Sequence, residues 1–246
     1  MIGSPFFTSL KKNKRKLIYF LFFINFSFYS GQVVLSQKVY NPFIDQNDSK
    51  VLIYKIESKD TVFNKNILRL EYNSRFFMSN QEQLLFDYCH SYDECTGSFE
   101  KMDGDKTIIN HYEVTGFTRK SNSLWLHPPR SDYFKILELN AFPYYIKDKN
   151  EWDYSVSFGK DWGNRLGLNY EGYLLTASTK YKAVREISYT FKDEKISCIE
   201  IQAKTTIPQI GDTKTIFYYN EKYGFVKMLF TTLNKKQIQF NLIEIL

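Results

Sequence analysis

Apolar and polar residues alternate with a period of two along most of the chain after residue 50. In Leu68-Arg69-Leu70-Glu71-Tyr72 the alternation is strict. It gives one apolar and one polar face, which is typical of an antiparallel sheet with one side in water. The segments with this pattern are rich in β-branched and aromatic residues, which favour strands. We expect strands at residues 51–57, 67–73, 83–90, 107–117, 133–139, 152–158, 183–191, 196–201, 215–219, 225–231 and 237–246.

Short polar segments separate the strands expected in the C-terminal half. Residues 192–195 and 234–236 have the composition of turns between apolar-alternating runs. Residues 220–224 end in Gly224, which can adopt the positive φ that closes a longer hairpin loop. These signals predict successive hairpins, and therefore a meander.

Helical periodicity is nearly absent. Residues 174–184 have partial 3.6 spacing, but their Thr and Tyr content favours a strand equally, so we expect no long helix. The strands recur at about the 8 to 12 residue spacing of all-β sandwiches and barrels. No Pro/Gly-rich linker divides residues 51–246, so we expect a single domain. The predicted fold is all-β: one curved antiparallel meander that forms an open or half-closed barrel, an architecture similar to that of lipocalins and periplasmic lipoprotein carriers.

The N-terminal residues 1–36 have the composition of a secretory signal. An apolar run of 13 residues, 17–29, follows a basic cluster. A helix that crosses a bilayer takes about 20 residues, so a signal is favoured over an uncleaved anchor, which stays the alternative. We expect cleavage before Gln37 and a linker at residues 37–50. The basic cluster consists of Lys11, Lys12, Lys14, Arg15 and Lys16.

The net charge of the chain depends mostly on this leader. Of 33 Lys and Arg residues, 5 lie in the leader, which leaves 28 against 27 Asp and Glu. No basic stripe is visible in the remainder, so we expect no nucleic-acid partner. The composition, rich in Lys, Asn, Ile and Tyr, suggests an AT-rich genome. With the leader, it favours an exported protein, periplasmic or extracellular, of a Gram-negative bacterium, and not an integral membrane protein after processing.

Two cysteines, Cys89 and Cys95, lie close together in the sequence. In an oxidising compartment we expect a disulfide between them. Two ordinary thiols are the alternative, and so is a zinc site with His90 and His111, although the spacing matches no standard zinc motif. Cys198 lies in an alternating run and is expected to be a small buried hydrophobe.

The segment around Pro128 and Pro129 interrupts an apolar strand. Trp125 and His127 precede the two prolines, and Arg130 follows them. His127 and Arg130 at a strand end could bind an anionic head group or a carboxylate. The alternative is a rigid polar turn between two core strands.

Aromatic residues cluster after the strand expected at 133–139. Phe142, Tyr144 and Tyr145 surround a proline and could line the mouth of a ligand site or fill the end of a barrel. Residues 159–167 contain three glycines at intervals of four, and we expect a loop there with Trp162 pointing inward. The tentative ligand-binding residues are Trp125, His127, Arg130, Phe142, Tyr144, Tyr145 and Trp162.

Catalytic motifs are absent from the sequence: there is no nucleophile elbow, zinc-protease helix, phosphate-binding loop or dinucleotide fingerprint. We therefore expect neither an enzyme nor a cofactor. The first hypothesis is an exported protein that binds a lipid, an acyl chain or an apolar protein segment on the concave face of its sheet, with His127 and Arg130 at the rim. The alternative is a structural or interaction module of the cell envelope that recognises a partner protein through an edge strand or an aromatic loop. A hollow interior would favour the first hypothesis, and a filled one the second.

Overall fold

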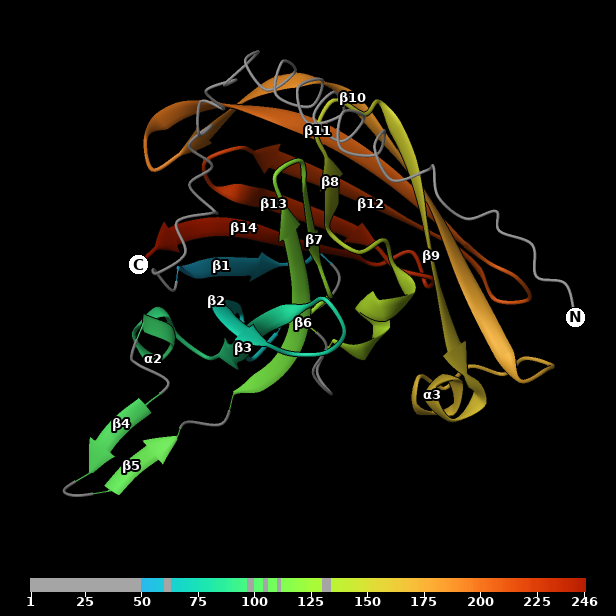
Figure 1. Cartoon of the computed structure of the whole chain (residues 1–246), viewed down its shortest axis with the longest axis horizontal. Helices are drawn as coiled ribbons and strands as arrows, with labels where there is room; N and C mark the ends of the chain where they lie inside the picture. The colour runs from blue at the N-terminus through green and yellow to red at the C-terminus, as the bar shows by residue number, and fades with distance from the viewer. Residues whose placement is uncertain (1–49, 60–62, 97–99, 104–105, 110–111, 130–133) are drawn as a thin grey trace, which may run out of the picture. The chain divides into compact units, whose positions relative to one another are not determined.

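A computed structural model describes residues 50–59, 63–96, 100–103, 106–109, 112–129 and 134–246 (Figure 1). The predicted leader, its cleavage site and residues 37–49 of the linker lie outside them. Within the described chain, twelve strands form one antiparallel sheet and two more form a separate hairpin. The main sheet contains β1 (Val51–Glu57), β2 (Ile67–Phe76), β3 (Glu82–Cys89), β6 (Glu113–Lys120), β7 (Ser123–Leu126), β8 (Tyr144–Ile146), β9 (Glu151–Gly159), β10 (Leu174–Phe191), β11 (Glu194–Ile207), β12 (Gly211–Asn220), β13 (Gly224–Thr231) and β14 (Gln237–Ile245). The separate hairpin is β4 (Glu100–Asp103) with β5 (Lys106–Ile109), and the short helices are α2 (Tyr92–Thr96), η1 (Lys135–Leu139) and α3 (Lys160–Arg165).

The strand order explains how the sheet curves. It runs β8-β7-β6-β3-β2-β1-β14-β13-β12-β11-β10-β9, so the first and last strands of the chain, β1 and β14, are paired in the middle of the sheet. The two edges are β8 and β9, which are consecutive in sequence and joined by residues 147–150. Since such a short connection must link opposite edges, the sheet curls until the two edges lie near each other, although they do not pair. The predicted curved meander, nearly closed into a barrel, is confirmed.

Most expected strands are present, but two strands and one loop differ from the prediction. The strand expected at 107–117 is divided between β5 and β6, which belong to different sheets. The strand expected at 133–139 contains the 3-10 helix η1. Leu137, Glu138 and Leu139 are all buried, so this apolar segment is enclosed on several sides, and periodicity alone does not distinguish such a run from a strand. The loop expected at 159–167 contains the short helix α3.

Two hairpin turns follow the chemistry that the sequence predicted. Between β10 and β11, Lys192 and Asp193 have φ of 48° and 65°, as a tight turn with two left-handed residues requires. Between β12 and β13, Gly224 has φ of 77°, the positive value expected for it. Residues 174–184, ambiguous in sequence, form the first part of the 18-residue strand β10.

The inner face of the sheet is packed with aromatic side chains. Seven of them, from β1, β3, β6, β12, β13 and β14, are less than 2% exposed: Tyr54, Phe86, Phe117, Phe217, Phe225, Phe230 and Phe240. Neighbouring rings meet edge to face, for example Phe217 with Phe230, whose centroids lie 6.0 Å apart. Edge-to-face contacts of this kind add to the free energy of burial.

Residues 134–143, which we call the inner segment, cover part of this face. Asn140 donates hydrogen bonds to the carbonyl oxygens of Lys214 on β12 and Thr231 on β13, at 3.1 and 3.0 Å. The Thr213 hydroxyl donates to the carbonyl of Leu139 at 2.8 Å. Phe134 lies among the rings of Tyr88 and Phe240. The inner segment therefore occupies part of the hollow of the sheet.

A second, smaller cluster lies on the opposite face of β1 to β3, under α2. It contains Val51, Ile53, Ile67, Cys89 and Cys95. Cys89 and Cys95 form a disulfide that ties α2 to the end of β3, with Cα atoms 5.6 Å apart. Arg69 of β2 is also buried and donates to the carbonyl of Cys95 at 2.9 Å. Over β1 to β3, the outer face of the sheet is therefore covered by α2.

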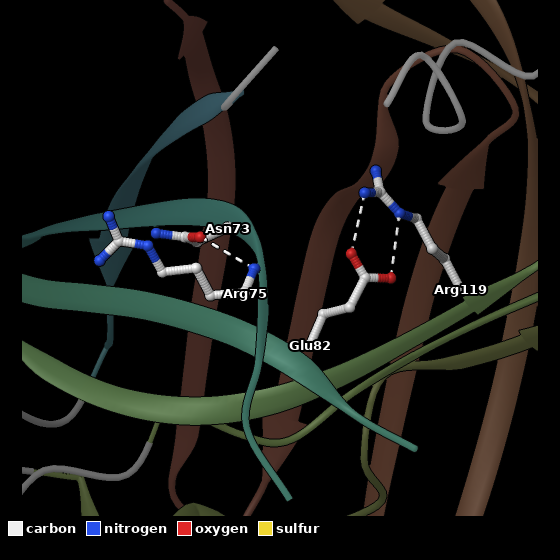
Figure 2. Close-up of polar contacts among 4 residues, drawn as sticks. All are labelled: Asn73, Arg75, Glu82 and Arg119. Carbon is white, nitrogen blue, oxygen red and sulfur yellow. Dashed lines mark hydrogen bonds and ion pairs between the residues drawn. The ribbon is translucent and has the colours of Figure 1, made fainter. Parts of the chain in front are cut away.

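The β2–β3 hairpin carries polar contacts at the point where its pairing becomes irregular (Figure 2). The side-chain oxygen of Asn73 accepts a hydrogen bond from the backbone of Arg75 at 3.0 Å. Glu82 of β3 accepts two hydrogen bonds from Arg119 of β6, at 2.9 and 3.3 Å, which fastens the next strand to this hairpin. At the turn itself, Phe76 and Met78 are exposed.

Candidate functional site

Four of the predicted site residues meet where the two edges of the sheet approach. Trp125 on β7 lies 5.7 Å from Phe142, and the His127 ring lies 4.9 Å from Phe142, between ring centroids. The Tyr144 ring of β8 lies 5.9 Å from that of Tyr154 on β9. With these four residues we group three that the sequence analysis missed, under the name aromatic seam: Trp152 and Tyr154 of β9 and Tyr181 of β10.

The aromatic seam holds the edges together through side chains. Trp152 and Tyr181 are stacked, with centroids 5.4 Å apart and planes 6° from parallel. The Tyr181 hydroxyl donates to the carbonyl of Phe142 at 2.9 Å, which fixes the inner segment to β10. Burial raises the pKa of Tyr144, Tyr154 and Tyr181, so these phenols stay neutral at physiological pH. The three phenols of the seam are therefore neutral aromatic contacts between β8, β9 and β10.

His127 is held by its own turn. Its backbone N–H donates to Gly116 at 2.9 Å, and its Nδ1 lies 3.0 Å from the carbonyl oxygen of Pro128. The Tyr88 hydroxyl donates to the carbonyl of Pro129 at 2.8 Å. These contacts are those of a rigid turn between core elements. Arg130, the partner expected for His127 at a rim, lies outside the described residues, as does His111.

Two other predicted residues lie away from the seam. Tyr145 stacks on Tyr219 of β12, with centroids 3.9 Å apart, and burial raises the pKa of Tyr145 to about 12. Trp162 is partly buried on α3, and its indole N–H donates to the carboxylate of Glu138 in η1. Both side chains serve packing: Tyr145 joins β8 to β12, and Trp162 joins α3 to the inner segment. No sequence motif predicted either contact. Each contact joins residues that are distant along the chain or that lie outside the regular strands.

The backbone of β9 has one unpaired edge within the described chain. β9 pairs with β10 along its nine residues, and its other side has no strand partner there. Asn150 accepts a hydrogen bond from Ala183, so in this antiparallel register residues 152, 154, 156 and 158 bond to β10. The backbone groups of Asp153, Ser155 and Ser157 therefore point to the unpaired side. We call this the free edge of β9.

β8, the strand at the opposite edge of the sheet, is too short to cover the free edge of β9. β8 has three residues and does not pair with β9, although the Tyr144 ring of β8 contacts those of Trp152 and Tyr154 on β9. At the far end of β9, Gly159 lies opposite Leu174, and Leu174 and its neighbour Tyr173 are 68% and 90% exposed. The free edge is thus bounded by the aromatic seam at one end and by exposed apolar residues at the other.

The buried carboxylates of the described chain are hydrogen-bonded. Glu200 is 4% exposed and accepts from Arg185 at 3.0 Å and from Gln202 at 2.8 Å. No group of three or more His, Cys, Asp or Glu side chains that could hold a metal ion is found among the residues that the structure describes. Among the same residues, no helix is both long and apolar enough to span a bilayer.

Comparison with known proteins finds resemblance only to solved structures. No family model and no curated protein matches the chain. A Bacteroides fragilis protein described as exported, with a YmcC-like fold, matches 80% of this chain and 95% of its own at 10% identity and a TM-score of 0.42. The hypothetical lipoprotein YmcC from Escherichia coli matches 80% and 86%, at 12% identity and a TM-score of 0.35. A protein of Parabacteroides distasonis described as a lipoprotein matches 82% and 96%, at 13% identity and a TM-score of 0.39. Similarity of this size assigns neither a family nor a function to this chain.

Proposed function

We propose that this chain is an exported, non-catalytic interaction module that binds an extended segment of a partner protein along the free edge of β9. The observation that carries the proposal is the nine-residue edge strand whose outward backbone groups have no strand partner in the described chain. An unpaired edge is a template on which another chain can add a strand. Main-chain hydrogen bonds supply the affinity in this mode of recognition, and side chains beside the edge supply the specificity.

The edge has few of the features that normally prevent such pairing. Proteins protect long edges with Lys, Pro or bulges, and β9 contains neither Lys nor Pro and pairs with β10 without a register shift. Its exposed residues are acidic or small, among them Asp153, Ser155 and Ser157. A partner strand that carries basic or small residues at alternate positions would suit this row. The leader composition, with a basic cluster before an apolar run, supports export as the setting.

The packed inner face argues against the first hypothesis, a carrier of acyl chains in the hollow of the sheet. Such a carrier gains its affinity from apolar area that the ligand removes from water. Here the inner segment and its aromatic neighbours already bury that area, with Leu137, Leu139 and Ala141 fully enclosed. Native mass spectrometry of the delipidated protein with palmitate and phosphatidylglycerol should show no retained lipid. A stoichiometric complex would restore the carrier hypothesis.

The test of the proposal is a proline on the free edge. Ser155→Pro removes an N–H that points away from β10, so the β9–β10 ladder keeps its hydrogen bonds. Ser155→Ala is the matched control, because it removes the same hydroxyl and keeps the N–H. Peptides are selected from a displayed random library for binding to the unaltered protein. Their Kd for Ser155→Ala should be unchanged, and their Kd for Ser155→Pro should be at least tenfold higher. Circular dichroism and Tm confirm that both variants are folded.

Hydrogen exchange tests the same edge without a ligand. The amides of Asp153, Ser155 and Ser157 should exchange fast in the isolated protein, whereas those of Tyr154 and Val156 should be protected by β10. Addition of a selected peptide should slow the hydrogen exchange of the amides of Asp153, Ser155 and Ser157. The proposal fails if these outward amides are protected in the isolated protein, or if the selected peptides bind Ser155→Pro as well as they bind the unaltered protein.

A further inference from the structure

The outer face of β10 to β14 contains a groove, distinct from the free edge of β9, with a volume of about 400 Å³. Four lysines line it: Lys180 and Lys182 of β10, Lys204 of β11 and Lys214 of β12. Ile216 of β12 and Leu229 of β13 also line it. The groove thus combines several cationic groups with aliphatic contact area, and its volume lies within the range of about 300 to 1,000 Å³ usual for small-molecule sites.

The strand register aligns three of the lysines in one row. Lys180 lies directly opposite Lys204, and Lys204 lies directly opposite Lys214. Adjacent strands are about 4.8 Å apart, so the row extends over about 10 Å across the sheet. Lys182 lies two residues further along β10, opposite Gln202, on the same face. The arrangement brings the four ammonium groups to one groove from positions 180 to 214 of the sequence.

The nearby carboxylates neutralise only part of this charge. Lys204 pairs with Asp212 at 2.6 Å, and Lys182 pairs with Glu151 at 2.9 Å. Hydrogen bonds from these lysines lower the pKa of both carboxyl groups, so both are ionised at neutral pH.

Two lysines of the row remain without such a partner. Lys180 and Lys214 have no carboxylate within 4.0 Å among the described residues. Asp153 lies opposite Lys180 in the register without forming an ion pair. Lys235 adds a further positive charge near Asp212, whose backbone oxygen accepts from its ammonium group at 3.3 Å. The groove keeps an excess of positive charge.

Like charges directly opposite on neighbouring strands destabilise a sheet. The pairs Lys180–Lys204 and Lys204–Lys214 therefore oppose folding. The ion pair of Lys204 with Asp212 and the Asp153 that faces Lys180 offset only part of this repulsion. We propose that the groove binds a small ligand with at least two phosphate groups, which bridge Lys180, Lys204 and Lys214 while an apolar part of the ligand contacts Ile216 and Leu229. Lysine can bind phosphate groups because its ammonium is a compact point charge with three donors on a flexible side chain.

The experiment is titration of the purified full chain with sodium tripolyphosphate by isothermal titration calorimetry, at low and at high salt. The double variant Lys180→Gln/Lys214→Gln should raise Kd at least tenfold. The control, Lys120→Gln/Lys195→Gln, makes the same change in net charge at exposed positions outside the groove and should change Kd less than twofold. Because the groove variant removes repulsion, its Tm should be equal to or above that of the unaltered protein, so a loss of binding does not reflect unfolding.

A second arm distinguishes a soluble phosphate ligand from a membrane surface. Vesicles of phosphatidylcholine with phosphatidylglycerol are offered to the same three proteins in a sedimentation assay. Tripolyphosphate binding that the groove variant alone weakens supports the proposal. It is overturned if tripolyphosphate does not bind, if both double variants weaken binding equally, or if the groove variant affects only vesicle binding. None of these outcomes depends on the free edge of β9, so this inference and the proposed function can fail separately.

Discussion

The two faces of β10 to β13 differ completely although their residues alternate along the same strands. On the inner face, Tyr181, Ala203, Thr215 and Phe230 form a continuous row of cross-strand partners, all at most 5% exposed. One residue earlier on β10 and one later on β11, Lys180 lies opposite Lys204 on the outer face, in water. Since successive side chains of a strand point to opposite faces, one sequence can specify packing on one side and recognition on the other.

The outer face also differs from one end of the sheet to the other. Over β1 to β3 it is covered by α2 and carries a small core around Ile53 and the Cys89–Cys95 disulfide. Over β10 to β14 it carries lysines and a groove. The four comparisons below test how much stability the inner face, the inner segment and the two parts of the outer face contribute.

The inner aromatic core should produce the largest effect. Phe217→Ala removes a side chain that is 0% exposed, and we expect a loss of about 3–5 kcal/mol in the free energy of unfolding. Its neighbour on the outer face, Ile216, is half-buried, so Ile216→Ala should cost about 1 kcal/mol. Urea unfolding measures both. Equal losses in the free energy of unfolding would contradict the description of the inner face as the main packed core and the outer face as a solvent-exposed surface.

The attachment of the inner segment comes next. Asn140→Ala leaves the carbonyl groups of Lys214 and Thr231 without the side-chain donor that now reaches them in partly buried positions, and we expect a loss of about 2–3 kcal/mol in the free energy of unfolding. Asn164→Ala, on the exposed side of α3, is the control and should change stability by less than about 0.5 kcal/mol. If the two variants unfold at the same urea concentration, the inner segment is not held by Asn140.

Loss of the disulfide on the covered part of the outer face should lower the free energy of unfolding by less than the two changes above. Cys89→Ser/Cys95→Ser opens a short loop, with a sequence separation of 6, so the expected loss is about 2 kcal/mol. Thermal and urea unfolding of the unaltered protein in excess reductant should give the same loss, because both treatments break the same bond. A variant as stable as the oxidised protein would mean that α2 is held by packing and by Arg69 alone.

The lysine row should give the smallest effect, and with the opposite sign. Lys180→Gln/Lys214→Gln should stabilise the ligand-free protein by about 0.2–1 kcal/mol at low ionic strength, because it removes repulsion between neighbouring strands. In 1 M salt, where charges are screened beyond about 3 Å, the gain should disappear. Tm measured at both salt concentrations tests this. A loss of stability at low salt would contradict the charge argument.

Of the candidate site, the sequence predicted some residue types but not their arrangement. Trp125, His127 and Phe142 were predicted from the sequence as tentative ligand-binding residues, and their rings are in contact in the structure. Trp152, Tyr154 and Tyr181 belong to other strands and were missed, because only the curl of the sheet brings them to the same edge. The sequence also did not predict the row of lysines. Lys180, Lys204 and Lys214 are separated by at least ten residues along the chain and become neighbours only through the strand register.

What the sequence by itself determined is the local character of each segment: the period of two, the polar turns and the glycine at residue 224 specify strands and hairpins, because these depend on nearby residues. What only the tertiary structure decided is how the strands close. The pairing of β1 with β14, the entry of the inner segment into the hollow and the position of the gap between β8 and β9 all depend on contacts between distant residues. Alternation gives each strand an apolar face but does not say which strand lies beside it, and both proposed sites depend on those neighbours.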